Sequence, residues 1–354
     1  MKRIERARLK LRECGLESVL ITDELNIRYI TDFDVSDAMV LLTVNSAHLL
    51  TDFRYYEMAL NALSEDFEVV SGGKRGDYIK DILANENISV LGFEGKAVTY
   101  EDYLRYKELF SPLELADVKE LFFDLRITKT DDEIEKIQKA QDIADTAFAE
   151  LLKAIKPEMT EIEVAAELEY IMRKLGSEGP AFSTIAVSGD ASALPHGVPR
   201  PEKLKNGFLT LDFGAKYMGY CSDMTRTVVI GKADDDMKKL YNTVLNAQLS
   251  AIEYLREGRD AYIADKVARD IINKDYEGAF GHSLGHGVGL LVHESPALSP
   301  RSEGCMLTTG NIVTVEPGIY LFGKYGCRIE DMIAIREDGI HNFTHSTKEL
   351  IELF

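Results

Sequence analysis

Charged side chains lie inside apolar, strand-like stretches in the second half of the chain. They constrain its possible fold and function more than any other feature of the sequence. The stretch FLTLDFGAKYMGYCSDMTRTVVI (208–230) is typical of two strands joined by a glycine-containing turn, each with an aspartate among apolar neighbours. Similar interruptions follow in GHSLGHGVGL (281–290), VTVEPGIYL (313–321) and CRIEDMIAI (327–335). A buried carboxylate is costly unless it is paired, hydrogen-bonded or bound to a metal. We therefore predict that the interrupting residues share one site: Asp212, Asp223, His286, Glu316 and Glu330.

This set of side chains matches the needs of two divalent cations. Four carboxylates and one imidazole supply hard oxygen donors, one nitrogen and four negative charges against four positive ones. Manganese, cobalt, zinc and iron all tolerate this mixture of donors, so the ligand set leaves the metal open; we expect manganese or cobalt, with zinc or iron as alternatives. Two such cations can polarise a carbonyl and lower the pKa of water, so hydrolysis is the natural reaction. The alternative is chance placement among 60 acidic residues and seven histidines, which five ordered, apolar-flanked positions argue against.

The length and pattern of the chain predict two domains. A chain of 354 residues with 45% hydrophobic residues exceeds the size at which one core usually remains undivided. Up to about residue 117 the chain alternates short apolar runs with helical stretches, which predicts an α/β domain whose strands are covered on both faces. We place the boundary so that the first domain spans 1–124 and the second spans 125–354.

The second domain is predicted to be α+β, with helices segregated over a sheet. Capping boxes at Thr130 and Thr160, each followed three residues later by glutamate, predict the starts of two helices, the first ended by Pro157. Another helical pair is expected over residues 231–275, and glycine-rich strands and loops then extend to Arg336.

Net charge and composition disfavour several classes of function. The net charge of −19 repels phosphate backbones and anionic membrane surfaces, so no nucleic-acid or membrane partner is expected. The opening MKRIERARLKLRECGL interleaves charged and apolar residues, as in an amphipathic helix rather than a secretory signal. The four cysteines lack zinc-ribbon or CxxC spacing, as expected of reduced thiols. We predict a cytoplasmic protein.

Several motifs, in order, resemble one known family. They are LRITKTDDEIEKIQKA, FSTIAVSGDASALPHG, LDFGAKYMGYCSDMTRT, HSLGHGVGLLVHESP, EPGIY and RIED. The chain resembles the Xaa-Pro peptidases, prolidase and aminopeptidase P, among the pita-bread-fold metallopeptidases, while methionine aminopeptidase is similar in the second half only. The first half resembles the creatinase/prolidase N-terminal domain through DELNIRYITDF and LLTDFRYYEMA. The resemblance implies hydrolysis of peptides with proline at the second position, and a homodimer.

The resemblance also implies roles for the five predicted ligands. Asp212 would hold one metal, Asp223 and Glu330 would bridge, and His286 and Glu316 would hold the other metal. In related enzymes a residue at the position of Glu316 also accepts a proton from the attacking water. These assignments come from the resemblance and not from the spacing of the residues.

Three histidines and one arginine complete the predicted site. His196, His282 and His293 stand where related enzymes place substrate-contacting or proton-relaying imidazoles, and we count them with Glu316 as catalytic. The alternative for each of the three is a histidine that only satisfies a local turn, and it has the least weight for His282. Arg328 resembles an arginine that positions the carboxylate of Glu330, and the alternative is a simple surface salt bridge.

One departure from the family bears on substrate length. Many prolidases carry an arginine shortly after a His-Glu-x-Pro stretch, where it binds the terminal carboxylate of a dipeptide. Here HESPALSPR offers only Arg301, several residues later. Because a carboxylate is best held by a matching guanidinium, longer Xaa-Pro peptides are favoured over dipeptides.

Three other functions remain as alternatives to an Xaa-Pro peptidase. They are a methionine aminopeptidase, a metal-free hydrolase resembling creatinase, and a peptide-binding module without catalysis.

Overall fold

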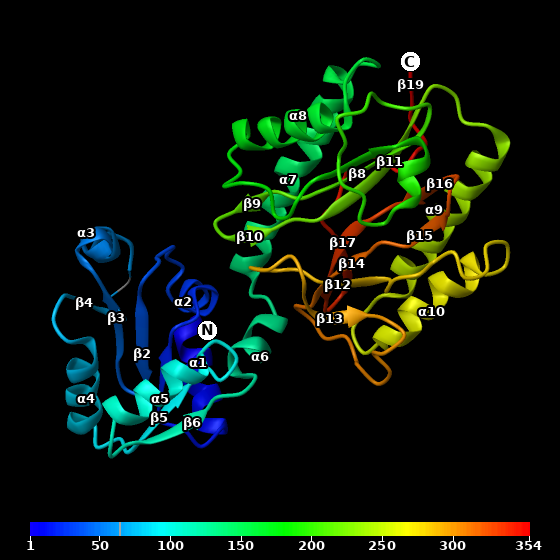
Figure 1. Ribbon diagram of the computed structural model, residues 1–354. Coiled ribbons are helices and arrows are strands. Elements are labelled where there is room, and N and C mark those ends of the chain that lie inside the picture. The colour runs from blue at the N-terminus through cyan, green and yellow to red at the C-terminus, as the bar shows by residue number, and fades with distance from the viewer. Residues whose placement is uncertain (64) are drawn as a thin grey trace. The chain divides into compact units, whose positions relative to one another are not determined.

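The computed structural model describes residues 1–63 and 65–354, which form two compact units, Met1–Arg126 and Ile127–Phe354 (Figure 1). The division falls within helix α6 (Leu121–Ile127), and the boundary that we placed after residue 124 lies in the same helix. No helix among these residues is both long enough and apolar enough to cross a membrane.

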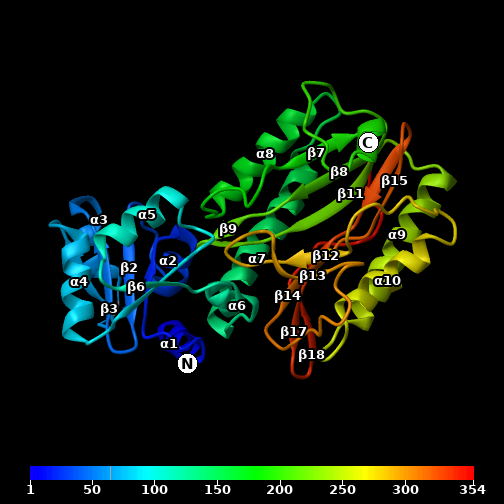
Figure 2. The same ribbon diagram turned by 60° about the horizontal axis from the view of Figure 1, so that its bottom comes forward.

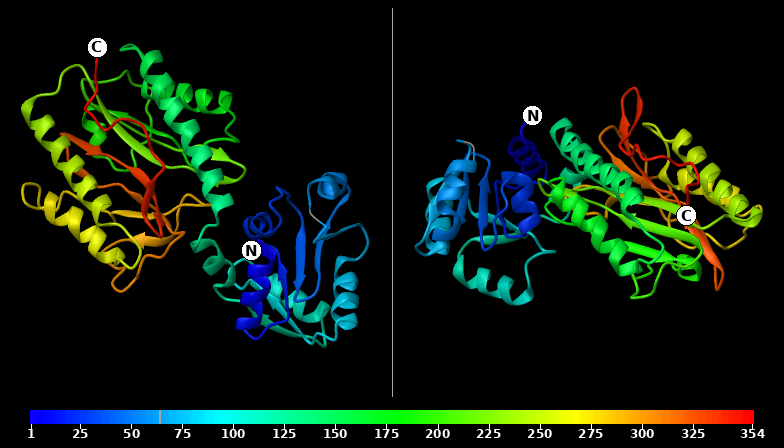
Figure 3. Two further views of the ribbon diagram at one scale, coloured as in Figure 1. Left: turned by 180° about the vertical axis from the view of Figure 1, so that it is seen from behind. Right: turned by 90° about the horizontal axis from the view of Figure 1, so that it is seen from above.

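The N-terminal unit is a mixed sheet with helices around it (Figure 3). Its strands are β1 (Ser18–Ile21), β2 (Met39–Thr43), β3 (Ala47–Thr51), β4 (Glu68–Ser71), β5 (Val90–Phe93) and β6 (Glu114–Asp117), in the order β4-β3-β2-β1-β5-β6. Its helices before α6 are α1 (Arg3–Glu13), α2 (Glu24–Thr31), α3 (Phe53–Ala62), α4 (Arg75–Asn85) and α5 (Tyr100–Leu109). Every residue of β1 and β3 is buried, as predicted for strands covered on both faces, whereas the edge strands β4 and β6 are partly exposed.

The second unit contains four long helices and two larger sheets, which are antiparallel except that β19 runs parallel to β11. The helices are α7 (Asp131–Ala154), α8 (Glu161–Lys174), α9 (Asp235–Tyr254) and α10 (Ala261–Ile272). One sheet has the order β19-β11-β8-β7, formed by Glu352–Leu353, Met224–Ile230, Gly207–Phe213 and Ile185–Ser188. The other has the order β13-β12-β14-β17-β18, formed by Glu294–Leu298, Gly285–Gly287, Ile312–Val315, Asp331–Arg336 and Gly339–Asn342. Two small hairpins complete the unit: β9 (Lys216–Tyr217) with β10 (Tyr220–Cys221), and β15 (Gly318–Leu321) with β16 (Tyr325–Arg328).

Local hydrogen bonds explain where α7 and α8 begin. Thr130 accepts a hydrogen bond from the backbone N–H of Glu133, whose carboxylate in turn accepts from the backbone N–H of Thr130. Thr160 and Glu163 repeat this reciprocal arrangement at the start of α8. Each box satisfies N–H groups that have no partner within the helix, so both predicted starts are confirmed.

The two helix pairs of the second unit lie on opposite sides of its strands (Figure 2). Helices α7 and α8 pack on β7, β8 and β11, where the rings of Phe148 and Phe213 stack with centroids 6.4 Å apart. Helices α9 and α10 share a second core with β14 and β17. Burial of these apolar faces stabilises the unit and holds β8, β11, β14 and β17 in place between the helices.

A buried ion pair fixes the start of α8 to the loop before β8. The carboxylate of Glu161 is fully buried and accepts hydrogen bonds from Arg200 (Nη2 to Oε1, 2.7 Å) and from the backbone N–H and hydroxyl of Ser188. Burial by itself raises the pKa of Glu161, but Arg200 and Ser188 outweigh it and lower the pKa below the usual 4.5.

The pH dependence of stability is expected to reveal this ion pair. A carboxyl whose pKa is lowered by folding stabilises the protein fully above its unfolded pKa and loses that contribution as pH falls through its folded pKa. The difference in unfolding free energy between wild type and Glu161→Gln should therefore shrink as pH falls from about 5 toward about 3. Urea unfolding at several pH values measures this difference, and a difference that is constant with pH contradicts the assignment.

Candidate metal centre

All nine residues predicted for the site line a single cavity of about 580 Å³ in the second unit. They are Asp212, Asp223, His286, Glu316, Glu330, His196, His282, His293 and Arg328. They come from β8, from β12, from the β15–β16 hairpin and from the segments that connect the strands, so the fold and not sequence proximity brings them together. Arg301, by contrast, is exposed and does not line the cavity.

Two neighbouring strands position the aspartates. Asp212 lies in β8 opposite Thr225 of β11, and Asp223 immediately precedes β11. Asp212 Oδ2 lies 2.5 Å from Arg328 Nη2, whereas Asp212 Oδ1 is buried and accepts no hydrogen bond within the described residues. A buried carboxylate oxygen without a donor is expensive in a protein interior, and a bound cation would satisfy it.

The second sheet contributes His286 from β12 and Glu316 from the end of β14. The Nε2 atom of His286 lies 3.6 Å from Asp223 Oδ2 and 3.4 Å from Glu316 Oε1. A Cβ atom at Gly285 would lie 1.9 Å from the carbonyl oxygen of Thr314, so only glycine allows β12 to approach β14 this closely. Gly285 therefore allows the close strand packing that brings His286 beside Glu316.

The imidazole of His286 is oriented as a neutral ligand. Its Nδ1 atom lies 3.1 Å from the carbonyl oxygen of Gly287, which can only accept, so Nδ1 carries the proton. Nε2 then presents a lone pair to the carboxylates. Burial, together with the neighbouring His293 whose ring centroid is 4.1 Å away, lowers the pKa of His286 to about 4.

Glu330 is held by β11. Its Oε2 atom accepts from Thr225 Oγ1 at 2.7 Å, and its backbone N–H donates to the carbonyl of Thr225 at 3.1 Å. One ligand atom from each of Asp223, His286 and Glu330 lies within 4.8 Å of the others, close enough to hold one metal ion.

The carboxylates strongly disfavour one another's ionisation. Desolvation raises the pKa of Asp223, and the charges of Glu330, Asp212 and Glu316 raise it further. Desolvation likewise raises the pKa of Glu330, again with the help of Glu316 and Asp212. For Glu316 desolvation and Asp212 raise the pKa to about 8, despite Arg328. Bound cations would neutralise these buried carboxylates and remove their mutual repulsion, so the residues fit divalent metals.

A chain of hydrogen bonds joins Asp212 to His282. Beyond Asp212, Arg328 donates from Nη1 to the hydroxyl of Tyr320 at 2.8 Å, and that hydroxyl lies 2.9 Å from Nε2 of His282. Nδ1 of His282 faces the carbonyl of Ser283 at 2.9 Å, so Nε2 accepts from Tyr320. Arg328 is almost fully buried and does not form the surface salt bridge that was its alternative.

Three further residues of the site, Tyr320, Thr225 and Thr314, were not among the predicted ones. Thr314 accepts from the backbone of His286 and donates to Glu316 at 3.2 Å. Tyr320 lies in the stretch EPGIY and Thr225 in CSDMTRT, and both stretches resemble the family. That resemblance was the sequence signal that could have identified the two residues. Arg328 also donates to Thr225 rather than directly to the carboxylate of Glu330, so it acts on Glu330 through that hydroxyl.

The fold and the site define a metallopeptidase. The sequence pattern of metallopeptidase family M24 matches residues 135–337, and that of the creatinase/prolidase N-terminal domain matches residues 3–128. The chain belongs to family M24, and its catalytic unit therefore works with a divalent metal. The pita-bread fold and the N-terminal domain expected from the sequence are confirmed.

Relatives of known structure cover nearly the whole chain. An Xaa-Pro dipeptidase from Bacillus anthracis is 43% identical with a TM-score of 0.93, and the match covers 99% of both chains. An X-Pro aminopeptidase from Thermotoga maritima is 37% identical with a TM-score of 0.92, over 98% of this chain and 100% of the other. An Xaa-Pro dipeptidase from Pyrococcus furiosus is 38% identical over 99% of both chains.

Proposed function

We propose that this protein is a metallo-exopeptidase that hydrolyses the bond between the first residue and a following proline. The observation that carries the proposal is the cluster of buried carboxylates with a neutral imidazole on the wall of one cavity. Membership of family M24 and the similarity to proteins named Xaa-Pro dipeptidase and X-Pro aminopeptidase support it.

The ligand set of this proposal consists of Asp212, Asp223, His286, Glu316 and Glu330, which would hold two divalent cations, manganese or cobalt. When bound, such cations lower the pKa of water and polarise the peptide carbonyl. The buried Oδ1 atom of Asp212 and the raised pKa values of the other three carboxyls support this set. They argue against a metal-free hydrolase, because four carboxylates would then be left to repel one another.

Glu316 and the three other histidines of the cavity have the proposed catalytic and substrate-binding roles. Glu316, on the cavity wall beside His286, is the proposed proton acceptor, and His282 is held by Tyr320 with its ring toward Glu316 (Nδ1 to Oε2, 3.9 Å). His196 and His293 line the same wall and are the proposed contacts to the substrate. Apolar side chains beside them, among them Phe182, Ile185, Val198 and Val292, offer the non-polar surface that a proline ring needs.

The charges around the cavity favour peptides longer than two residues. Within the described part of the second unit, Arg328 is the sole arginine or lysine on the cavity wall. Its guanidinium already binds Asp212, Tyr320, Thr225 and the carbonyl of Pro195. The cavity wall therefore offers no free arginine or lysine to pair with the terminal carboxylate of a dipeptide, whereas a longer peptide presents a neutral amide in its place.

A panel of matched peptides tests both the reaction and the length preference. With manganese-loaded enzyme, we expect kcat/KM for Ala-Pro-Ala and Ala-Pro-NH2 to exceed that for Ala-Pro by roughly 10- to 100-fold, the worth of one charged hydrogen bond. Met-Ala-Ala and Ala-Ala-Ala should be poor substrates, and chelation should abolish activity. Equal or faster cleavage of Met-Ala-Ala would contradict the proline assignment, and faster cleavage of Ala-Pro than of its amide would contradict the length preference.

The homodimer and the cytoplasmic location remain predictions from the sequence. Helix α3 offers a candidate surface for a second copy, since Phe53, Met58 and Leu60 are all exposed there.

A catalytically inactive peptide-binding module is disfavoured, because no ligand of the proposed set is missing.

A further inference from the structure

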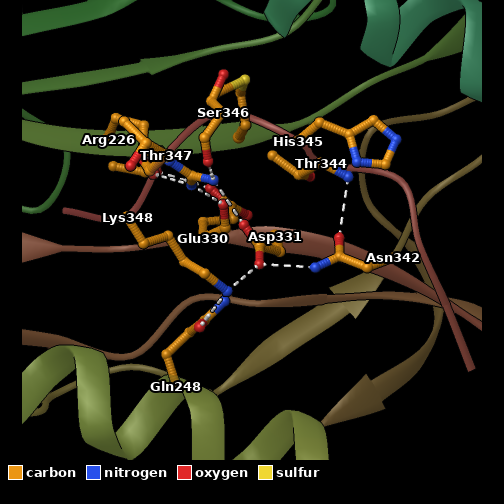
Figure 4. A network of polar contacts seen from close by, with 12 residues as sticks. Arg226, Gln248, Glu330, Asp331, Asn342, Thr344, His345, Ser346, Thr347 and Lys348 are labelled. Carbon is orange, nitrogen blue, oxygen red and sulfur yellow. Dashed lines mark hydrogen bonds and ion pairs between the residues drawn. The ribbon is translucent and has the colours of Figure 1, made fainter.

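We propose that Arg226, Asp331 and Lys348 form a buried positioning network that fixes Asp223 and Glu330 for metal binding and makes the C-terminal segment 344–348 part of the metal centre (Figure 4). This inference rests on the proposed ligand set. None of the three side chains lines the cavity, so the network acts through other residues.

Arg226 is the centre of the network. Its side chain is 2% exposed, and each of its N–H groups has a matching acceptor. The acceptors are the carbonyls of Thr347 (Nε, 3.0 Å), Thr225 (Nη1, 2.9 Å), Glu330 (Nη1, 2.6 Å) and Ser346 (Nη2, 2.8 Å), and Asp331 Oδ1 (Nη2, 2.8 Å). One planar guanidinium thus joins three segments that are distant in sequence: the start of β11, the start of β17 and the C-terminal segment.

Asp331 and Lys348 complete the network outside the lining of the cavity. The carboxylate of Asp331 is fully buried, and its Oδ2 atom accepts from Lys348 Nζ at 2.6 Å and from Asn342 Nδ2 at 3.0 Å. Lys348 also donates to Gln248 of α9 at 3.1 Å. Figure 4 shows Lys348 between Gln248 and Asp331, with Arg226 on the other side of the carboxylate.

The network reaches the metal ligands through the backbone. Arg226 holds the carbonyl of Glu330, and the preceding Thr225 holds its N–H and its carboxylate. Asp223 is only two residues before Thr225, so both proposed bridging ligands are fixed to the same short stretch of β11. A small displacement of this stretch would move both carboxylates, and metal affinity is sensitive to groups that orient the ligands.

Metal titration of a variant at the edge of the network tests the proposal. Lys348 is suitable because its side chain is 21% exposed, so Lys348→Met is milder than a change at Arg226. We expect calorimetric titration of the metal-free full-length protein with Mn²⁺ to give a Kd about 10-fold weaker than wild type. Lys348→Arg should bind Mn²⁺ like wild type, because it restores the charge and donors.

The matched control is Lys232→Met. Lys232 follows β11 and binds Glu352 in the same C-terminal region at 2.9 Å, but it contacts neither Asp331 nor Arg226 and is largely exposed. Its Kd for Mn²⁺ should equal that of wild type. Equal weakening in both methionine variants, or a lower melting temperature of Lys348→Met with unchanged Kd, would show a merely structural role and overturn the proposal.

A second variant keeps the test decisive if Lys348→Met does not fold. Asn342→Ala removes one donor from Asp331 at a partly exposed position and should weaken Mn²⁺ binding about 3-fold. An unchanged Kd in this variant overturns the inference. Because the readout is binding, it separates the two proposals: wild type that binds no Mn²⁺ overturns the proposed function as well, whereas normal binding by wild type and variants overturns this inference alone.

Discussion

Replacing Asp223 with asparagine is expected to lower kcat/KM for Ala-Pro-Ala by about 10³-fold, because a bridging ligand supports several kcal/mol of metal-dependent stabilisation of the transition state. The same substitution should leave unchanged or raise the melting temperature of the metal-free protein. Asp223 is buried beside Glu330, Asp212 and Glu316, which disfavour its ionisation, so a neutral isostere removes repulsion. Loss of activity without loss of stability is the signature of a ligand.

Thermal unfolding with and without Mn²⁺ separates these effects. The increase in melting temperature caused by the metal should be large for wild type and small for Asp223→Asn, because a ligand stabilises the folded state by an amount that grows with the logarithm of its affinity. The control is Asp236→Asn on the exposed surface of α9, which should behave as wild type in both assays. A metal-free Asp223→Asn protein that melts well below wild type would contradict the prediction, because Asp223 would then be a structural residue.

Replacing Lys129 with methionine is expected to destabilise the protein by about 3 kcal/mol, a large fraction of the stability of a typical domain. Lys129 Nζ lies 3.1 Å from Glu294 Oε2, and the two side chains are 1% and 5% exposed. Removing the cation leaves the carboxylate of Glu294 buried beside an apolar side chain. Because Glu294 follows His293, we also expect a higher KM for Ala-Pro-Ala.

The double variant Lys129→Met, Glu294→Gln provides the control. Replacing the second charge with a neutral group should restore most of the lost stability, since the cost comes from burying the Glu294 carboxylate without the charge of Lys129. Urea unfolding of the wild type, both single variants and the double variant gives the coupling energy. If the double variant is as unstable as Lys129→Met, the ion pair does not explain the loss.

Local sequence signals determined much of the secondary structure. The starts of α7 and α8 were predictable because Thr130 and Thr160 make their capping hydrogen bonds only three residues away. The buried strands of the first unit were likewise visible as short apolar runs. The partial exposure of β4 was not visible in the sequence. It arises because β4 is an edge strand, and the pairing order of the whole sheet decides which strand lies at the edge.

For the site, the sequence by itself determined the candidate ligands, since Asp212, Asp223 and Glu330 interrupt apolar strands at visible positions. Only the tertiary structure decided which atoms meet. Arg328 and Asp212 are 116 positions apart, and Arg226 and the carbonyl of Glu330 are 104 apart. Such contacts depend on the path of the chain through two sheets, which local propensity does not encode, whereas a carboxylate in an apolar strand shows its energetic cost directly in the sequence.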